Sequence, residues 1–397
     1  MWLSAIYTLK ERCGVGSIYQ QIGGGASKVQ EAAPPPSAVA QIRSLPATCR
    51  SKFFSQVFVL DSSIDILGAT GFIGGQVLHD LIALKKYDIT ALIRDKPRAD
   101  RLSSATGVKT VIADLDSAGL ADIVSQFDIV LHLAHADHVE GANAIVSGLE
   151  KRAANNPSRK PLLIHTSGTG VLIDVNEEKG KIKSEKIYSD GDLSSYHSLP
   201  STNIHKNVDD IVLAAGRRGK IDAIIVAPPT IWGTGQGQFN THSIQVPLYI
   251  KAVLQIGEGI VLEDGINTWS IIHVADLSRG YLTILDAALH GKIPSDPEGR
   301  YFFCEQGEYE QIQVAKTVTK ALYEKGKVKK PEPRRVTKAE VNEFGEGRKN
   351  VVNLTGGNSR SRAVLLRRLG WEAERGGNKE FIESIKDEVE YVLKNQA

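Results

Sequence analysis

The residues with the clearest chemical meaning form a glycine-rich turn in which Gly68, Gly71 and Gly74 recur every third position. The turn follows the apolar, β-branched run 64–67 and opens a segment with helical periodicity. Glycines let a backbone turn tightly and approach a pyrophosphate, and a helix N-terminus offers free N–H groups to it. We therefore expect a dinucleotide to lie here, the alternative being a strand-to-helix turn that binds nothing. The residues assigned to this contact are Gly68, Thr70, Gly71, Phe72, Ile73 and Gly74.

The choice between the two nicotinamide dinucleotides is expected at the end of the next strand. The strand 89–93 is followed by Arg94 and Asp95. An arginine at this place suits the ribose 2′-phosphate of NADP, whereas an acidic residue would accept from the 2′-hydroxyl of NAD. The sequence favours NADP through Arg94, and NAD through Asp95 remains the alternative.

The elements that must position these residues alternate along the chain. Short apolar runs separated by helix-period segments are typical of βαβ units and a parallel sheet. We predict an α/β fold with a Rossmann-type doubly wound sheet and a smaller C-terminal substrate lobe. The predicted domains are a disordered extension at 1–56, a dinucleotide-binding domain at 57–234 plus 268–290, and a capping lobe at 235–267 plus 291–397. The expected strands are 64–67, 89–93, 110–112, 129–133, 162–166, 223–227 and 269–273, with 57–60 as a second candidate for the first strand.

The turn spacing and several later segments resemble the extended short-chain dehydrogenase/reductase superfamily, in its NAD-dependent epimerase/dehydratase branch. The matching pieces occur in order: Asp114-Leu115, Leu131 to Ala134, His165 to Gly168, Pro228 to Gly233 and Ile271 to Leu277. The resemblance implies that Asp114 and Leu115 contact adenine, and that Ala134 and Pro228 also lie along the cofactor. It implies a small-molecule substrate held between the two lobes.

The catalytic residues depart from this family. Family enzymes use a Ser or Thr after the fifth strand, and Tyr and Lys spaced Y-x-x-x-K on the next helix, to move a proton at the reacting oxygen. Ser167 matches the first, but the segment 201–210, where the tyrosine is expected, contains none. One alignment places Ser201 and His205 at the Tyr and Lys positions, and the other places Thr202 and Lys206 there, with Asp209 or Asp210 as the acidic residue that follows.

Ser167, His205 and Lys206 are the candidate catalytic residues. His205 carries an imidazole, which can move a proton, while Lys206 would hold the nicotinamide ribose. Tyr188 and Tyr196, in the loop before this helix, are the alternative proton donors. We predict an NADP-dependent oxidoreductase or epimerase-like enzyme acting on a carbonyl or hydroxyl; the alternative is an NADP-sensing regulator that has lost the tyrosine, like the nitrogen-metabolite-repression regulators of the superfamily.

Composition limits the partners. The formal net charge is +2, which favours neither nucleic acid nor an anionic membrane. The longest apolar runs fall far short of the ~20 residues that a membrane helix needs. Three cysteines are too few for a disulfide framework and fit a cytoplasmic protein, with a mitochondrial transit peptide at the N-terminus as the alternative. No metal site is expected from His132, His135 and His138, because His132 lies in a strand. The oligomeric state is left open, a homodimer being one option.

Overall fold

The computed structural model describes residues 63–174 and 178–395, and these belong to one compact unit. The expected extension at 1–56 and the candidate strand 57–60 lie outside the described residues. The first described strand is the one joined directly to the glycine turn.

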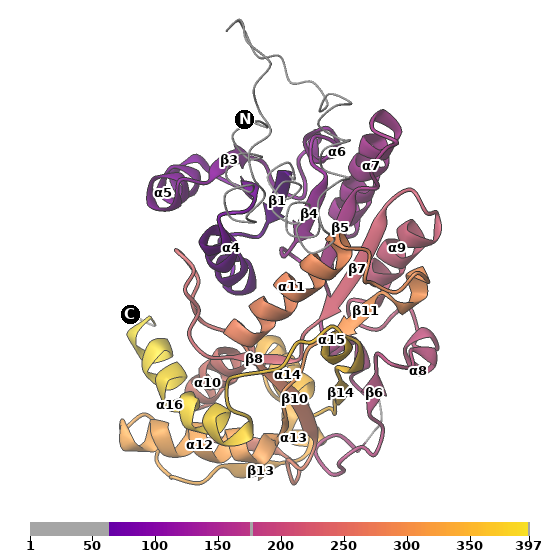
Figure 1. Ribbon diagram of the computed structural model, residues 1–397. Coiled ribbons are helices and arrows are strands. Elements are labelled where there is room, and N and C mark those ends of the chain that lie inside the picture. The colour runs from indigo at the N-terminus through magenta and orange to yellow at the C-terminus, as the bar shows by residue number, and fades with distance from the viewer. Residues whose placement is uncertain (1–62, 175–177, 396–397) are drawn as a thin grey trace, which may run out of the picture. The chain divides into compact units, whose positions relative to one another are not determined.

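The centre of the described chain is a seven-stranded parallel sheet (Figure 1). Its order is β11-β7-β5-β4-β1-β2-β3, the arrangement of a doubly wound fold. The bounds are β1 Ser63–Leu67, β2 Asp88–Ile93, β3 Lys109–Ile112, β4 Ile129–His132, β5 Leu162–Thr166, β7 Asp222–Ala227 and β11 Tyr301–Phe303. The predicted fold class and six of the predicted strands are confirmed.

The seventh predicted strand was placed in the wrong sheet. Residues 269–273 belong to β10 (Thr268–His273), which pairs with β8 (Thr230–Trp232) and β12 (Glu308–Glu310) in a separate sheet. The edge of the central sheet is β11 instead. The error has a physical source: an apolar run reports burial and not the identity of the neighbouring strand. The predicted division into domains stays a prediction.

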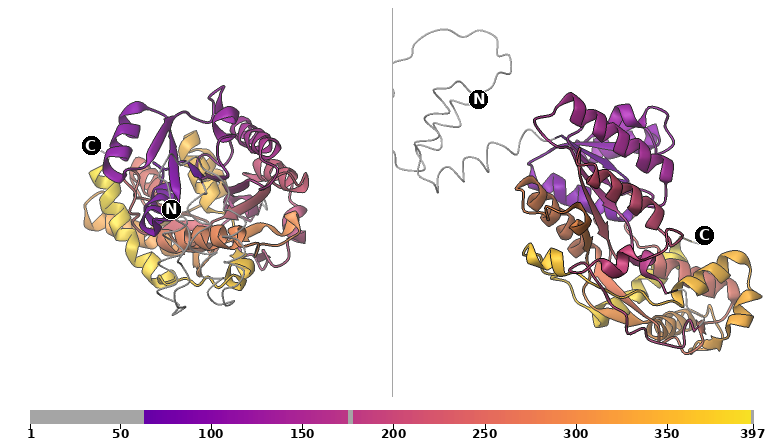
Figure 2. Two further views of the ribbon diagram at one scale, coloured as in Figure 1. Left: turned by 45° about the horizontal axis from the view of Figure 1, so that its top comes forward. Right: turned by 90° about the vertical axis from the view of Figure 1, so that its right-hand side faces the viewer.

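Helices cover both faces of the central sheet (Figures 1 and 2). Tyr281, on α11 (Val274–Leu289), shares a hydrogen bond with Thr166 of β5, and Asp209, on α9 (Lys206–Arg217), faces the adjacent His165. Successive residues of a strand point to opposite faces, so α11 and α9 lie on opposite sides. Helix α4 (Phe72–Leu84) packs against α11, and α7 (Val139–Asn155) packs against α9 and the short α6 (Leu120–Val124). Helix α5 (Lys96–Thr106) packs on β2 and β3.

The remaining described elements contribute to the core of the central sheet, to a second, smaller core around Trp232, Trp269 and Phe381, or to a third one around Ile260, Leu262 and Val341. Besides the β8–β10–β12 sheet they include two strand pairs, one between β9 (Ile260–Leu262) and β13 (Arg334–Val336), and one between β6 (Tyr188–Ser189) and β14 (Ser361–Arg362). The helices are α8 Ser194–His197, α10 Gln245–Ile256, α12 Gln311–Glu324, α13 Lys338–Asn342, α14 Glu346–Thr355, α15 Val364–Arg368 and α16 Asn378–Lys394.

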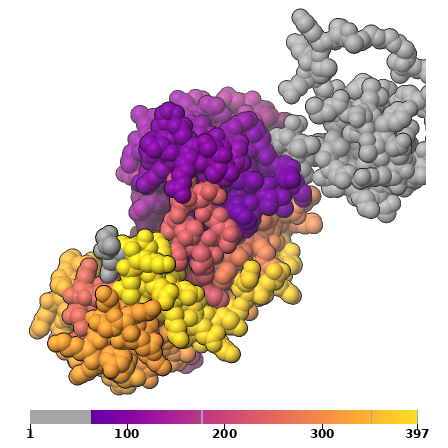
Figure 3. All heavy atoms as spheres, turned by 90° about the vertical axis from the view of Figure 1, so that its left-hand side faces the viewer, coloured from indigo at the N-terminus to yellow at the C-terminus, as the bar shows by residue number. Residues whose placement is uncertain are grey.

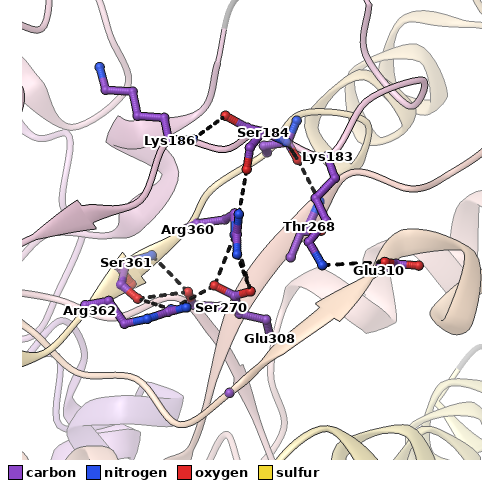
Figure 4. Close-up of polar contacts among 12 residues, drawn as sticks. Lys183, Ser184, Lys186, Thr268, Ser270, Glu308, Glu310, Arg360, Ser361 and Arg362 are labelled. Carbon is purple, nitrogen blue, oxygen red and sulfur yellow. Dashed lines mark hydrogen bonds and ion pairs between the residues drawn. The ribbon is translucent and has the colours of Figure 1, made fainter.

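A charged cluster attaches the C-terminal segment to this lobe (Figure 4). Glu308 of β12 accepts hydrogen bonds from Arg360 at 3.0 and 3.1 Å and from Arg362 at 2.7 Å. Arg360 also donates to the carbonyl of Ser184 at 2.6 Å. Because both guanidinium groups donate to one half-buried carboxylate of β12, the cluster connects β14 and the residue before it to β12.

Candidate dinucleotide and catalytic site

The glycine turn has the geometry of a phosphate cradle. Gly68 has a φ of +92°, and a Cβ there would lie 2.4 Å from the carbonyl oxygen of Leu133. A Cβ at Gly74 would lie 2.2 Å from the carbonyl oxygen of Gly68. At Gly71, the N-cap of α4, the nearest atom to an added Cβ is the Gly68 oxygen at 3.1 Å. Gly68 and Gly74 are thus required by the turn itself, while Gly71 leaves room for a ligand.

The start of α4 is chemically suited to an anion. Its first turn holds no acidic residue, and the N-cap makes no side-chain hydrogen bond to it. Thr70 and Ile73 are half-buried and Phe72 is buried, so the turn is packed on one side and open on the other. The free N–H groups and the helix dipole favour a negatively charged group at this place.

The two residues after β2 have different environments. Arg94 is exposed, and no hydrogen bond or ion pair of its side chain is recorded within residues 63–174 and 178–395. Asp95 is the N-cap of α5 and accepts from the backbone N–H of Arg98 at 2.9 Å. The carboxylate of Asp95 therefore caps helix α5, whereas the guanidinium of Arg94 is free to contact a ligand.

The remaining predicted cofactor residues lie beyond the carboxyl ends of neighbouring parallel strands. Asp114 follows β3 and accepts from the hydroxyl of Ser117 at 2.7 Å, with Leu115 half-buried beside it. Ala134 follows β4 and is half-buried. Pro228 follows β7 and is buried, and its carbonyl accepts from the N–H of Thr169 at 2.9 Å. All three strands end on the edge where open α/β sheets bind ligands.

The predicted Y-x-x-x-K alignments do not share a helix face. Helix α9 begins at Lys206, and Ser201 and Thr202 are exposed residues of the loop before it. A spacing of four residues places side chains together only within a helix. Neither Ser201 with His205 nor Thr202 with Lys206 is therefore arranged as a helical pair.

His205 is held by an aspartate that the sequence analysis missed. The residue has a φ of +69°, and Asp137 Oδ1 accepts from both its backbone N–H at 2.9 Å and its ring Nδ1 at 2.7 Å. The other ring nitrogen, Nε2, faces the glycines after β5: added Cβ atoms would lie 3.0 Å from it at Gly168 and 3.2 Å at Gly170. The hydrogen bond from His205 holds the pKa of the Asp137 carboxyl below its ordinary value.

Ser167 and Tyr196 lie on a buried carboxylate instead of facing solvent. Asp209 Oδ2 accepts from Ser167 Oγ at 2.9 Å, from Tyr196 OH at 3.0 Å and from Tyr301 OH at 3.0 Å. Asp209 is fully buried, and burial raises its pKa to about 6. Since each hydroxyl gives its single proton to Asp209, neither Ser167 nor Tyr196 has a proton to donate elsewhere.

Lys206 is buried at the start of α9. Its ammonium pairs with Asp210, the residue one turn on, and lies 5.1 Å from the centre of the Tyr196 ring. Tyr188, the other alternative proton donor, belongs to β6, and Lys186 lies over its ring at 4.5 Å.

The histidines after β4 separate in space. His132 lies in β4 with its Nδ1 2.8 Å from Nδ1 of His165, whereas His138 caps α7 and contacts Asp116 through Nε2 at 3.0 Å. His135 is exposed. Across the described residues, no group of three or more His, Cys, Asp or Glu side chains is arranged to hold a metal ion.

Comparisons with known proteins agree with this geometry. Residues 68–188 match the family described as NAD(P)H-binding, and residues 205–296 match the NAD dependent epimerase/dehydratase family. The chain therefore contains an NAD(P)-binding segment and an epimerase/dehydratase segment. The resemblance stated from the sequence is thereby confirmed.

Its curated relatives are distant. The oxidase ucsJ of Acremonium sp is 25% identical over 268 residues, which span 64% of this chain and 76% of that protein. An uncharacterized protein of Schizosaccharomyces pombe is 25% identical over 247 residues, spanning 58% of this chain and 72% of that protein.

Solved structures share the fold at low identity. The dTDP-glucose 4,6-dehydratase of Bacillus anthracis in complex with NAD is 16% identical, with a TM-score of 0.56 over 84% of this chain and 97% of that one. The UDP-glucuronic acid 4-epimerase of Bacillus cereus in complex with UDP-glucuronic acid and NAD is 13% identical, with a TM-score of 0.55 over 84% and 99%. Of the helices that the structure describes, none is long and apolar enough to cross a membrane.

Proposed function

We propose that this epimerase/dehydratase-like protein is an NADP-dependent enzyme that acts on a carbonyl or hydroxyl group of a small molecule. The observation that carries the proposal is the pair of His205 and Asp137, with His205 Nε2 next to Gly168 and Gly170, which follow β5. A histidine held at one nitrogen by a carboxylate presents the other nitrogen for proton transfer. The pair would supply the proton-moving group that the missing tyrosine supplies in family enzymes.

The residues present also fit the cofactor. The open amides at the start of α4 would hold the pyrophosphate, and Arg94 would donate to the 2′-phosphate in a bidentate contact. When bound, the dinucleotide supplies or takes up a hydride. The solved relatives named above are complexes with NAD, so the preference for NADP depends on Arg94 and on the use of Asp95 as a helix cap.

The contacts of His205 indicate how a proton would move during the reaction. In the direction of reduction, His205 Nε2 donates to the oxygen of the substrate as its carbonyl becomes a hydroxyl, and Asp137 stabilises the ring by accepting from Nδ1. In the reverse direction the neutral ring takes the proton back. Lys206 would contact the nicotinamide ribose, and Ser167, whose hydroxyl donates its hydrogen bond to Asp209, can only accept a further one.

The test starts from the fall in NADPH absorbance when purified protein meets a panel of aldehydes and ketones. His205→Gln is then expected to lower kcat roughly 10²-fold with little change in cofactor affinity, while Lys206→Met weakens cofactor binding and rate together. Asp137→Asn should also lower kcat with little change in cofactor affinity. The matched control is His290→Gln, which changes an exposed histidine after α11. Full activity in folded His205→Gln would show that the proton comes from another group.

A regulator that senses NADP is the second candidate. It is favoured by the absence of a tyrosine at 201 and 202 and by the commitment of Ser167 and Tyr196 to Asp209. Such a protein would bind NADPH in a titration and show no turnover with any substrate of the panel.

A further inference from the structure

A row of buried polar side chains crosses one face of the central sheet. In the strand register His132 of β4 is opposite His165 of β5, which is opposite Ile225 of β7, which is opposite Tyr301 of β11. Residues opposite one another in a parallel sheet point to the same face. The two imidazoles and the phenol are each at most 1% exposed. Helix α9 covers this face and brings Asp209 to it.

The two histidines must be opposite tautomers. Their Nδ1 atoms are 2.8 Å apart, so one carries the proton and the other accepts it. Burial lowers the pKa of His132 to about 4 and that of His165 well below its ordinary value, so both rings are neutral. A neutral imidazole carries a single proton, which is either on Nδ1 or on Nε2.

Asp209 decides which tautomer each ring takes. Its Oδ1 has no hydrogen-bond partner in the described structure and lies 3.9 Å from His165 Nε2. Its Oδ2 accepts from three hydroxyls, an arrangement that suits an ionised carboxylate. An N–H facing this carboxylate is attracted and a lone pair is repelled. His165 therefore carries its proton on Nε2, and His132 carries its proton on Nδ1.

Asp209 itself lies in the first turn of α9. The backbone N–H of Asp209 donates to the carbonyl of His205 at 3.0 Å, and its side chain holds Tyr196, whose ring lies under the Lys206 ammonium. We propose that Asp209 is the positioning residue of this site: it sets the tautomers of His165 and His132 and holds the first turn of α9, from which His205 and Lys206 project. The catalytic part of this inference rests on the proposed function, and the tautomeric part does not.

The tautomers are tested by nitrogen NMR of protein labelled at histidine, with signals assigned to His132 and His165. In the unmutated protein we expect His165 protonated at Nε2 and His132 at Nδ1; the opposite pair, or two identical tautomers, overturns the proposal. In Asp209→Asn the amide N–H₂ can take the place of Oδ1, so both tautomers should invert. Asp210→Asn, one residue on, should leave them unchanged, and unchanged tautomers in folded Asp209→Asn would again overturn the proposal.

The positioning role is tested by kinetics on the same variants. Asp209→Asn is expected to lower kcat by up to about 10²-fold, the loss that a displacement of about 1 Å at a reacting group can cause. Inverted tautomers with an unchanged kcat would overturn the positioning role. If neither the unmutated protein nor any variant turns over a substrate, the proposed function fails. The NMR spectra still decide the tautomers in that case. Should Asp209→Asn fail to fold, the spectrum of the unmutated protein and that of Tyr301→Phe, which keeps the carboxylate opposite His165, give the same decision on the tautomers.

Discussion

At the scale of single residues, neighbouring side chains of one loop have separate tasks. Arg94 is exposed and Asp95 caps α5, although the sequence alone makes both of them candidates for the cofactor ribose. A carboxylate that accepts from a helix N-terminus loses that stabilisation if it turns to a ligand. Local capping therefore favours Arg94 as the residue that meets the ribose.

Arg94→Asp is expected to shift the preference from NADP toward NAD. The change removes a bidentate partner of the 2′-phosphate and adds an acceptor for a 2′-hydroxyl. Binding titrations with both cofactors measure the ratio of affinities. Asp95→Asn serves as the control, since an amide keeps a capping oxygen, and an unchanged ratio in Arg94→Asp would place the arginine away from the phosphate.

At the scale of elements, the glycine turn divides into structural and ligand-facing positions. Side chains at Gly68 and Gly74 would run into backbone atoms of the turn itself or of the segment after β4. Gly71 has only one close neighbour, the Gly68 carbonyl oxygen. Substitutions within one motif should therefore separate folding from binding.

Gly71→Val is expected to abolish dinucleotide binding and leave most of the stability, because the branched side chain occupies the approach of the pyrophosphate. Gly74→Ala is expected to lower the melting temperature by several degrees, because its Cβ collides with backbone. Thermal melting and cofactor titration of both variants measure the two effects. Binding retained by folded Gly71→Val would contradict the assignment of the phosphates to this turn.

Strand β1 contains an ionisable group with no partner. Asp65 is fully buried, and neither carboxyl oxygen has a hydrogen-bond partner in the described structure. Burial raises its pKa from 3.8 to about 7. The folded protein thus holds a proton that the unfolded chain releases at lower pH, so this group's contribution to stability is fully present below about pH 4 and is lost as the pH rises through about 7.

Asp65→Asn is expected to remove the loss of stability that Asp65 causes as the pH rises. One pKa unit corresponds to about 1.36 kcal/mol, so the difference in unfolding free energy between variant and unmutated protein should grow by on the order of 4 kcal/mol between pH 4 and pH 8. Urea unfolding at several pH values measures it, and other titrating groups cancel in the difference. A difference independent of pH would mean that Asp65 keeps one charge state in both folded and unfolded protein.

At the scale of the whole molecule, the loop 233–243 after β8 contacts both helix α4, which follows the glycine turn, and the C-terminal helix α16. Its backbone donates from Gln236 to Gln76 Oε1 at 2.9 Å, and Gly237 packs against Gly75 at the start of α4. At its other end His242 stacks on Tyr391 of α16, with ring centres 3.6 Å apart. Figure 3 shows this part of the chain between the indigo N-terminal residues and the yellow C-terminal helix.

Gly237→Ala is expected to weaken NADP binding roughly ten-fold, or about 1.4 kcal/mol, because its Cβ would lie 2.8 Å from the Cα of Gly75 and lift the loop from α4. Gly347→Ala is the matched control, since no atom lies within 4 Å of its added Cβ. Cofactor titration and the rise in melting temperature on adding NADPH measure the effect. Equal affinities in the two variants would show that the loop takes no part in holding the cofactor.

Some features of the protein follow from its sequence alone. The order of strand, glycine turn, helix and strand, the doubly wound sheet, and the positions of Arg94, Asp114 and Pro228 at strand ends were all predictable. They depend on patterns within about 30 residues of chain, where periodicity and turn chemistry act directly.

Other features were decided only by the tertiary structure. That β11 and not β10 completes the central sheet, that Asp137 holds His205, and that Tyr301 shares Asp209 with Ser167 and Tyr196 are contacts between segments far apart in the chain. An apolar run or a lone acidic residue carries no information about its partner, because hydrophobic burial is non-directional and a side-chain hydrogen bond exists only once the backbone has brought donor and acceptor together.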